Sequence, residues 1–497
     1  MQFISTLSDM RETEQHAFNS GISSQELIFR AAEAVVSHLD ECKAPFAIVC
    51  GKGNNAADGY AIALLLHKRG LSCTVIRVSG GTSQDSMYFL QNCYEIGIPV
   101  ERYSELTCFD HYSTIVDCLF GIGYHDPMPV EYRAIIDSIN HSNAYRISVD
   151  IPSGLNANSG TGYPVHANMT VSIGRLKTGH FLNQGMDSTG MLYNHDIGLF
   201  SETKEIALFE AEDLPSVLTH RNHLSNKSTY GYVGLIGGSQ RYQGALRLAE
   251  AANTAMRSGA GVVRIAFPRS IINVVAAGTL ESTLFPLTCG KDGQLMFIED
   301  EFRELILGLK VIAFGMGIGV SPETRKALLF LLHEYKGTLI IDADGLNILS
   351  GLTADEYSTP TCQIVLTPHL LEFSRLCGKT IPEIQSSMPF IARDYANDHS
   401  VVLLLKGPCT IITDGMKTNL VTRGCAGMAT AGSGDVLSGI MAALCGECND
   451  DLLTAASAAA WLNGKAGELA ETEYGAAGMV SGDTARMITK VIQSLRQ

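Results

Sequence analysis

The sequence predicts an α/β protein with two domains, each built on a mainly parallel β-sheet with helices on both faces. The chain has 497 residues, more than one hydrophobic core ordinarily spans. Short apolar runs of strand length alternate with longer helical runs in two separate series. Between them, residues 200–228 are polar and contain Pro215. We therefore place the domains at 1–210 and 211–497.

Composition restricts the possible partners. Apolar residues make up 46% and charged residues 18% of the chain, as in ordinary globular proteins. The net charge of −15 disfavours a nucleic acid or an anionic membrane as a partner. The chain starts without a basic patch and apolar core, and no run approaches the ~18 apolar residues that span a bilayer. We expect a cytoplasmic protein.

The 13 cysteines are scattered, and several lie in apolar runs. We expect buried, reduced thiols. Cys445 and Cys448 form a lone CxxC with no second pair and no histidine cluster nearby. A zinc or redox site is the less favoured interpretation of this pair.

The first series has the rhythm of βαβ units. We expect strands at 46–50, 73–79, 113–121 and 145–154, and a helix at 56–70. The carboxyl ends of parallel strands meet at one edge of the sheet, where ligands bind. The loops at 51–58, 117–127 and 150–160 fall at that edge.

The stretch CGKGNNAADGY, residues 50–60, follows the first strand and opens the helix. It is close to the dinucleotide-binding pattern G-x-G-x-x-G/A. That pattern also requires an acidic residue at the end of the next strand, and the first acid here is Asp85. A typical NAD-dependent dehydrogenase is therefore disfavoured, although the helix N-terminus would still attract phosphate.

Oxygen-bearing side chains gather at the same predicted edge. Asn55 and Asp58 lie in the Gly-rich stretch, Asp117 and Asp150 end two strands, and Ser153 follows. Oxygen ligands without His or Cys suit a hard cation such as potassium, magnesium or calcium. Alternatively, Asp117 and Asp150 only cap helices or turns.

The second series also alternates strands and helices. We expect strands at 230–239, 261–268, 311–319, 337–347, 362–369 and 401–408, and helices at 244–261, 434–446 and 453–470. The most informative stretch is AGMATAGSGDVLSGIMAAL. Its loop 432–434 leads into a helix whose N–H groups can hold a phosphoryl group in transfer. Asp435 could accept a proton from a substrate hydroxyl, or it could serve only as an N-cap.

Other polar residues follow strands of this series. Lys406 and a glycine turn suit contact with a nucleotide. His369 and Glu372 lie just past another strand, where His369 is alternatively a capping or packing residue. Asp342 ends a strand, and the turn FGMGIG (314–319) would let backbone approach a ligand closely.

The motifs GKGNNAADGY, VDCLFGIG and SVDIPSGLNANSG resemble the N-terminal domain of the bifunctional NAD(P)H-hydrate repair enzymes, the YjeF family, over roughly residues 5–205. The later motifs are similar to the C-terminal dehydratase domain of that family over roughly residues 225–495. The resemblance implies a Rossmann-like domain followed by a ribokinase-like domain.

It also implies two activities. The first domain would epimerise the R and S hydrates of NADH and NADPH at C6 of the nicotinamide ring. The second would dehydrate the S hydrate with ADP or ATP. The implied cofactors are K+ in the first domain and Mg2+ with the nucleotide in the second. We expect a homo-oligomer. The alternative is a ribokinase-class small-molecule kinase with a non-catalytic N-terminal binding domain.

By motif position, the resemblance implies particular site residues. Contacts to the epimerase substrate would come from Asn54, Asn55, Ala56, Ala57, Asp58, Gly121, Ile122, Gly123, Tyr124, His125, Asp126, Pro127 and Asp150. The potassium ligands would be Asn55, Asp117 and Ser153. Contacts to the dehydratase substrate would come from Ala245, Gly317, Gly319, His369 and the catalytic Asp435. Nucleotide contacts would come from Lys406, Gly407, Pro408, Cys409, Thr410 and Gly434.

The chain departs from the family pattern at two places. Ala56-Ala57 replaces the usual Gly-Gly, and Asn226 stands where the second domain usually has His. A positive φ would cost alanine about 1 kcal/mol or more relative to glycine. We predict that both alanines have negative φ and that the epimerase site is retained.

Overall fold

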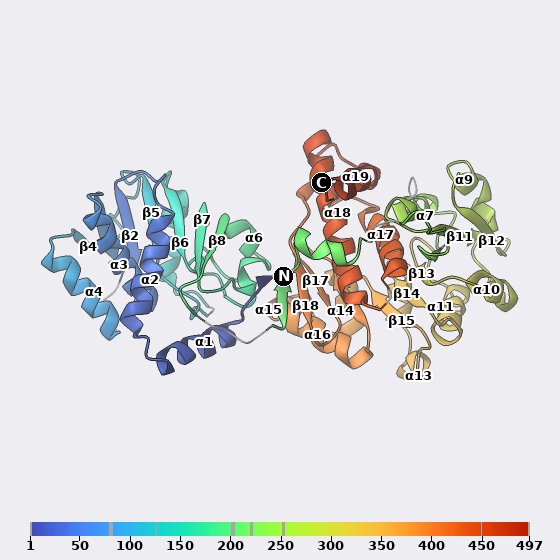
Figure 1. Ribbon diagram of the computed structural model, residues 1–497, viewed down its shortest axis with the longest axis horizontal. Coiled ribbons are helices and arrows are strands. Elements are labelled where there is room, and N and C mark those ends of the chain that lie inside the picture. Colours follow the sequence, from blue (N-terminus) through green and yellow to red (C-terminus); the bar gives the residue numbers. More distant parts are fainter. Residues whose placement is uncertain are drawn as a thin grey trace. The chain divides into compact units, whose positions relative to one another are not determined.

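The computed structural model describes residues 2–78, 83–125, 127–199, 204–218, 222–250, 254–448 and 450–495. It divides into two compact bodies (Figure 1). The first covers Phe3–Lys204 with Gln385–Ser387, and the second covers Gln2, Glu205–Ile384 and the residues from Met388 onward. Strand β9 (Ile206–Leu208) belongs to the sheet of the second body, although a boundary at residue 210 assigns it to the first.

The first body contains a seven-stranded sheet in the order β4-β3-β2-β5-β6-β7-β8, and each neighbouring pair is parallel. Its strands are β2 (Phe46–Cys50), β3 (Cys73–Arg77), β4 (Val100–Arg102), β5 (Thr114–Cys118), β6 (Tyr145–Val149), β7 (Met169–Ile173) and β8 (Met191–His195). From β2 the chain adds strands toward one edge of the sheet (β3, β4), and from β5 it adds them toward the other edge (β6, β7, β8). The loops after these two strands therefore diverge into a crevice at the carboxyl edge.

Helices cover both faces of this sheet. They are α1 (Leu7–Asn19), α2 (Ser24–Ser37), α3 (Asn54–Lys68), α4 (Gln84–Glu95), α5 (Val130–His141) and the short α6 (Gly185–Ser188). Phe46, Ile48 and Cys50 pack in one cluster with α2 and α3, whereas Ala47 and Val49 pack in another with α5. Alternate residues of β2 thus enter opposite layers, and for this reason the whole strand is apolar.

The second body contains an eleven-stranded sheet in the order β1-β9-β18-β17-β16-β15-β14-β13-β10-β11-β12. Besides β9, its strands are β1 (Gln2–Phe3), β10 (Tyr232–Ile236), β11 (Val262–Pro268), β12 (Thr283–Leu287), β13 (Val311–Phe314), β14 (Thr338–Ile341), β15 (Gln363–Leu366), β16 (Val402–Leu405), β17 (Thr410–Thr413) and β18 (Thr418–Val421). The pairs β16–β17 and β17–β18 are antiparallel, whereas β10 to β16 pair in parallel.

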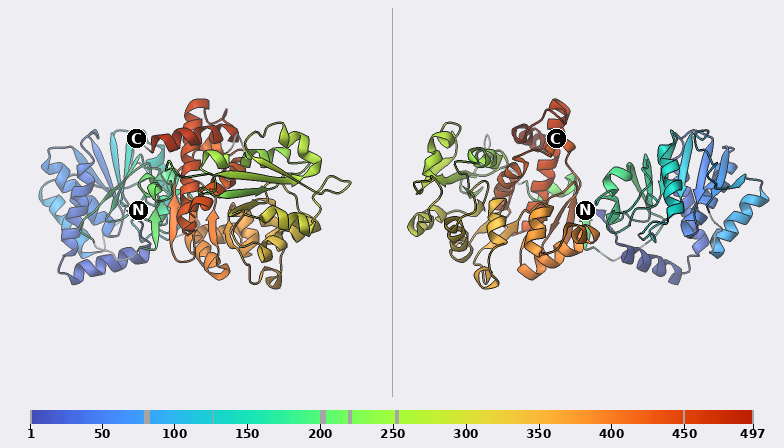
Figure 2. Two further views of the ribbon diagram at one scale, coloured as in Figure 1. Left: turned by 45° about the vertical axis from the view of Figure 1, so that its right-hand side comes forward. Right: turned by 180° about the vertical axis from the view of Figure 1, so that it is seen from behind.

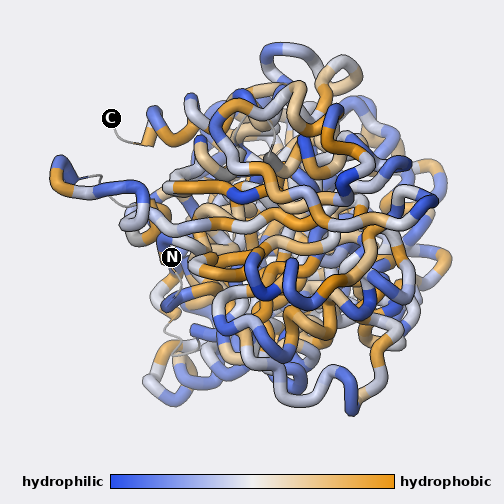
Figure 3. Tube along the Cα trace, turned by 90° about the vertical axis from the view of Figure 1, so that its right-hand side faces the viewer, coloured by the Kyte–Doolittle hydropathy of each residue, from blue (hydrophilic) through white to orange (hydrophobic). Residues whose placement is uncertain are grey.

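Its longer helices are α7 (Gln243–Glu250), α10 (Glu299–Ile306), α11 (Pro322–Glu334), α14 (Leu370–Cys377), α16 (Met388–His399), α17 (Ser433–Glu447), α18 (Leu452–Tyr474) and α19 (Ser481–Ser494). The shorter ones are α8 (Thr254–Arg257), α9 (Ile272–Ala276), α12 (Asp344–Leu349), α13 (Ala354–Tyr357) and α15 (Ile381–Ser386). Figure 2 shows the helical layers on either side of this sheet. Hydrophobic segments run through the interior strands, and hydrophilic segments gather in the outer loops (Figure 3).

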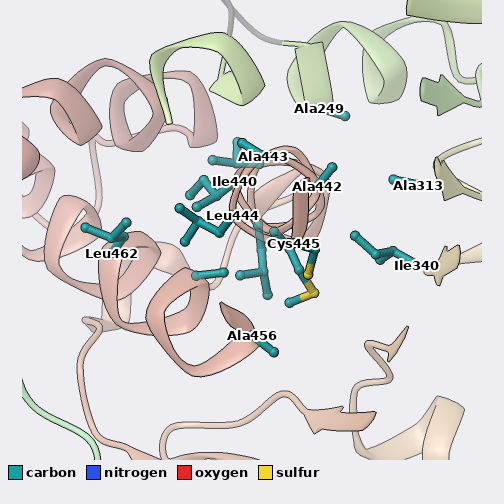
Figure 4. Close-up of a cluster of buried hydrophobic side chains, with 14 of the residues drawn as sticks. Ala249, Ala313, Ile340, Ile440, Ala442, Ala443, Leu444, Cys445, Ala456 and Leu462 are labelled. Atoms are coloured by element: carbon teal, nitrogen blue, oxygen red, sulfur yellow. The ribbon is translucent and has the colours of Figure 1, made fainter. Parts of the chain in front are cut away.

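Helix α17 lies at the centre of the second core. Figure 4 shows it end-on, with strand residues Ala313 and Ile340 on one side and Ala456 and Leu462 of α18 on the other. Eleven consecutive residues of α17, from Val436 to Gly446, are buried. A helix that is apolar all round must be surrounded by protein, so the position of its first turn is determined by packing along its whole length.

Seven of the 13 cysteines are buried, as the sequence predicts, whereas five are partly buried and Cys108 is exposed. All 13 are free, and Cys445 is buried in the core around α17. The residues that the structure describes include no cluster of His, Cys, Asp and Glu that could hold a metal ion. None of the described helices is both long and apolar enough to cross a membrane. The predicted helix 244–261 includes residues 251–253, which lie outside the described residues.

Candidate active sites

The first body has a pocket of about 440 Å3 at the carboxyl edge of its sheet. Its wall comes from α1, α2, the start of α3, the loop after β5, the ends of β6 and β7 and the segment after β8. Gly51 brings two of these loops together, since a Cβ there would lie 1.9 Å from the carbonyl oxygen of Leu119. The glycine in the sequence motif is therefore needed for this close approach of the loops after β2 and β5.

The three predicted cation ligands lie in one hydrogen-bond network. Asn55 Nδ2 and Ser153 Oγ both donate to the carbonyl oxygen of Phe120, at 2.9 and 3.1 Å. Ser153 N–H donates to Asp117 Oδ2 at 2.9 Å. Burial raises the pKa of Asp117, and the hydrogen bonds from Ser153, Ser148 and Leu119 partly offset this. These side chains supply oxygens and a desolvated negative charge, a donor set that suits a hard cation.

The predicted epimerase contacts divide into two groups. Those that line the pocket are Asn54, Asn55, Asp58, Gly121, Ile122, Gly123, Tyr124 and Asp150. The side chains of Ala56 and Ala57 are instead fully buried in the core, inside α3. Neither alanine is among the described residues with positive φ, so our prediction about their backbone is confirmed. His125 and Pro127 do not line the pocket, and Asp126 lies outside the described residues.

Asp150 is held by residues that the sequence analysis missed. Its φ of 69° is unusual for a residue other than glycine. The fully buried ammonium of Lys177 contacts Asp150 Oδ1, which also accepts a hydrogen bond from Ile173 N–H at 2.8 Å. Lys177 and the histidine that follows in the short turn Thr178–His180 carry no recognisable motif. Only the fold brings them to Asp150.

His180 completes this support. Its Nδ1 accepts from the backbone N–H of Lys177 at 3.2 Å, so the proton lies on Nε2, which donates to the carbonyl oxygen of Asp150 at 2.9 Å. Burial, reinforced by the charge of Lys177, lowers the pKa of His180 to about 4. A neutral imidazole therefore fixes the backbone of Asp150, and an ammonium balances its carboxylate.

In the second body, a buried ion pair lies below the start of α17. Lys406 Nζ is 2.8 Å from Asp342 Oδ1, and Ser438 Oγ donates to Asp342 Oδ2 at 2.8 Å. Burial alone would raise the pKa of Asp342, but Lys406 and the hydrogen bonds lower it overall. Burial would likewise lower the pKa of Lys406, but Asp342 and Glu372 raise it overall. Both groups therefore keep their charges.

Asp435 lies beside this pair in the first turn of α17. Burial and the neighbouring carboxylate of Asp342 raise the pKa of Asp435 to about 7. Gly432 has a φ of 90° at the N-cap, and the backbone of Gly434 passes so close that a Cβ would lie 3.3 Å from Lys406 Nζ. A carboxylate that titrates near neutrality is suited to general base catalysis. At this helix start it lies among backbone N–H groups that can bind phosphate.

His369 is a helix cap, the alternative that the sequence left open. Its Nδ1 accepts from the backbone N–H groups of Leu371 and Glu372, both at 3.2 Å. Glu372 Oε2 accepts from His369 N–H at 2.9 Å, which completes a capping box on α14. The His369 side chain is still half exposed, although its Nε2 lies 3.4 Å from Glu372 Oε1. Glu372 also lies 3.9 Å from Lys406, which joins this cap to the ion pair.

The other predicted contacts of the second body occupy neighbouring turns. A Cβ on Gly317 would lie 2.9 Å from the Cβ of Ala245, so these two residues adjoin. Gly319 N–H donates to Asp344 Oδ2 at 2.8 Å. In the turn after Lys406, Thr410 Oγ1 donates to the carbonyl oxygen of Gly407 at 3.3 Å.

Cys409 and Asn226 have clear structural roles. Cys409 is buried, and burial raises the pKa of its thiol to about 12. Only the backbone of Cys409 therefore remains for a nucleotide contact, together with Gly407, Pro408 and Thr410. The side chain of Asn226 accepts from Ser228 N–H at 3.0 Å and caps a local turn.

Two family models match this chain: YjeF-related protein N-terminus over residues 24–179, and NAD(P)H-hydrate dehydratase over residues 233–490. The chain is 32% identical to the "Bifunctional NAD(P)H-hydrate repair enzyme Nnr" of Thermofilum pendens, over 91% of this chain and 88% of that protein. It is 32% identical to the enzyme of that name from Coxiella burnetii, over 95% and 96%.

A solved structure resembles the second body. It is the ADP/ATP-dependent NAD(P)H-hydrate dehydratase of Bacillus subtilis co-crystallised with ATP/Mg2+, with a TM-score of 0.50 and 26% identity. The match covers 58% of this chain and 98% of the bacterial one. Both family models and the near-complete relatives agree along the chain. The protein therefore belongs to the family of bifunctional NAD(P)H-hydrate repair enzymes.

Proposed function

We propose that this chain repairs hydrated NADH and NADPH. The first body would interconvert the R and S hydrates, and the second would dehydrate the S hydrate at the expense of ADP or ATP. The observation that carries the proposal is Asp435, which has a pKa of about 7 and lies at the start of α17 beside Lys406 and Asp342. Family membership supports both halves.

The dehydratase chemistry follows from the leaving group. The hydrate carries a hydroxyl on the carbon beside the ring nitrogen, and hydroxide leaves poorly. Asp435 would remove the hydroxyl proton while the oxygen attacks the terminal phosphoryl group of the nucleotide. Phosphate then leaves from carbon, and loss of a proton from the adjacent carbon restores the double bond. The N–H groups of residues 432–434 would stabilise the moving charge.

The nucleotide would lie against the turn that contains Lys406, Gly407, Pro408, Thr410 and the helix start at Gly434. Mg2+ bound with it would neutralise phosphate charge. Asp342 and Asp344 are acidic residues whose charges raise the pKa of Asp435, so they lie close enough to act on this site. The bacterial dehydratase crystallised with ATP/Mg2+ supports this part of the proposal. Lys406 already pairs with Asp342. The negative charge of Asp342 would therefore weaken the attraction of Lys406 for the nucleotide phosphates.

In the epimerase, K+ would be held by Asn55, Asp117 and Ser153, and would balance the desolvated charge of Asp117. Asp150, fixed by Lys177 and His180, would contact the nicotinamide ring. We also propose that the epimerase occupies residues 3–204 and the dehydratase 205–497, and that the protein is a cytoplasmic homo-oligomer. Light scattering of the purified chain tests its oligomeric state.

Incubation of the full chain with mixed R and S hydrates, ADP or ATP, Mg2+ and K+ tests the whole proposal. We expect the near-ultraviolet absorbance of NADH to return completely, because the epimerase would convert R into S as S is consumed. Recovery that stops at the S fraction would reject the epimerase half. A phosphorylated product without any recovery of NADH would instead favour a ribokinase-class kinase.

A further inference from the structure

Helix α1 contributes a carboxylate to the pocket of the first body. Leu7, Met10, Arg11, Glu14 and Phe18 line the pocket, and their spacing places them on one side of the helix. Glu14 therefore projects from a largely apolar wall into the cavity that Asp150 lines from another element. It precedes residues 24–179, which the family model of this domain matches.

Glu14 is not a structural ion-pair partner. Within the part of the chain that the structure describes, its carboxylate forms no hydrogen bond or salt bridge, although it is partly buried. Burial raises the pKa of Glu14, and the charge of Asp150 raises it further, while Lys177 and Arg11 lower it. The other charged residues on the pocket wall are Lys52 and Asp58. Glu14 thus holds its proton to higher pH than an exposed glutamate does.

Inversion at C6 of the hydrate requires both an acid and a base. The C6–O bond must break and then form again on the other face of the ring. The departing oxygen needs a proton to leave as water, while the lone pair of the ring nitrogen forms a C=N bond. The water that returns must lose a proton as its oxygen bonds to C6. Positioned side chains typically accelerate such proton transfers by ~10^2–10^4-fold.

We propose that Glu14 is the general acid of this reaction and that Asp150 is its general base. Glu14 gives its proton to the C6 hydroxyl, and water leaves. A second water adds to the opposite face, and its proton passes to Asp150. One water leaves and one enters, so atoms and electrons balance, and the two residues exchange roles in the reverse direction. The proposal rests on the epimerase function proposed above.

The surroundings of the two carboxylates differ in the way that these roles require. Asp150 forms a salt bridge with the fully buried Lys177, so a cation lies directly against its carboxylate. Burial is the largest effect on the pKa of Glu14 and outweighs the charges of Lys177 and Arg11, so it favours the neutral form; within the described part of the chain, Glu14 forms no salt bridge. Two carboxyl groups with opposed surroundings in one pocket are typical of acid–base pairs.

The test uses the full chain with K+ present and compares Glu14→Gln with the control Glu12→Gln. Glu12 is exposed on the same helix and does not line the pocket. R-to-S conversion is followed chromatographically without nucleotide. We expect Glu14→Gln to lower kcat by ~10^2-fold or more with KM within about threefold, and Glu12→Gln to match wild type. Glu14→Asp should recover part of the rate.

The pH profile separates catalysis from a structural role. Wild-type conversion should decline as pH rises through the raised pKa of Glu14, because the acid loses its proton, and Glu14→Gln should lack this decline. Dehydration of pure S hydrate with ADP should be equal in all variants, which shows that the chain has folded. In H2(18)O the product of wild-type inversion should acquire the label.

Three results would overturn the proposal. They are a Glu14→Gln enzyme with the kcat and pH profile of wild type, a change confined to KM, and inversion without solvent label. Absence of any wild-type acceleration is a different result, since it rejects the epimerase function itself.

Discussion

Lys406 Nζ lies 2.8 Å from Asp342 Oδ1, and the backbone of Gly434 passes directly over the pair. The side chain of Asp342 is 2% exposed and that of Lys406 is 22% exposed. Ser438, one turn into α17, donates to the other oxygen of Asp342. One ion pair therefore joins the ends of β14 and β16 to the helix that carries Asp435.

Removing the cation of this pair should destabilise the second body. Lys406→Met would leave the Asp342 carboxylate buried without its partner, which costs about 3–5 kcal/mol. Urea unfolding followed by the fluorescence of Trp461, the single tryptophan, measures this loss. Lys326→Met breaks the more exposed pair with Glu323 and should cost less than about 1 kcal/mol. Equal losses in the two variants would contradict our account of the buried pair.

Asp435→Asn should abolish most of the dehydration and leave epimerisation intact. The amide cannot accept the hydroxyl proton, so kcat should fall by ~10^2-fold or more. Asp450→Asn, an exposed change, is the matched control. A rate within a few-fold of wild type for Asp435→Asn would reject the base role.

The pH dependence of dehydration has a definite sign. A base works in its deprotonated form, and the pKa of Asp435 is about 7. The rate with S hydrate should therefore be full above that pH and fall as pH drops through about 7. Initial rates in buffers of constant ionic strength measure this. A base with the pKa of an ordinary aspartate would keep its full rate down to pH ~5.

Potassium should stabilise the first body through Asn55, Asp117 and Ser153. At saturating K+ we expect the thermal midpoint of the separately expressed residues 1–204 to rise by about 2–4 °C over that in Li+ at equal ionic strength. Asp117→Asn should lose this rise, because the neutral amide offers no charge to the cation. An equal rise in wild type and variant would show that the effect is not due to this site.

Restoring glycines at Ala56 and Ala57 should weaken the fold without improving the epimerase. Both residues are helical and fully buried, so each change to glycine should cost about 1 kcal/mol or more. Chemical unfolding of the double variant measures this cost, and R-to-S conversion should keep the wild-type KM. A gain in affinity for the hydrate would mean that the methyl groups obstruct the site.

The sequence by itself determined the two α/β domains, most of the central strands and the loops that carry the candidate site residues. Apolar runs such as 46–50 can be recognised because a strand covered on both faces must be apolar throughout. It also determined the type of donor at each site, because Asn55, Asp117 and Asp435 fall where strands end or helices begin. The antiparallel strands β17 and β18 were missed, because four-residue strands joined by tight turns carry little periodicity.

Only the tertiary structure decided which charges meet. Lys177 reaches Asp150 across 27 positions of sequence, and Lys406 reaches Asp342 across 64. No local sequence pattern predicts which residues pair across such separations. The structure also decided the direction of each pKa shift, because the shifts at Glu14 and Asp435 come from desolvation and from neighbours on other strands and helices. Residue type supplied the chemistry, whereas burial and proximity, which depend on packing, decided how each group can act.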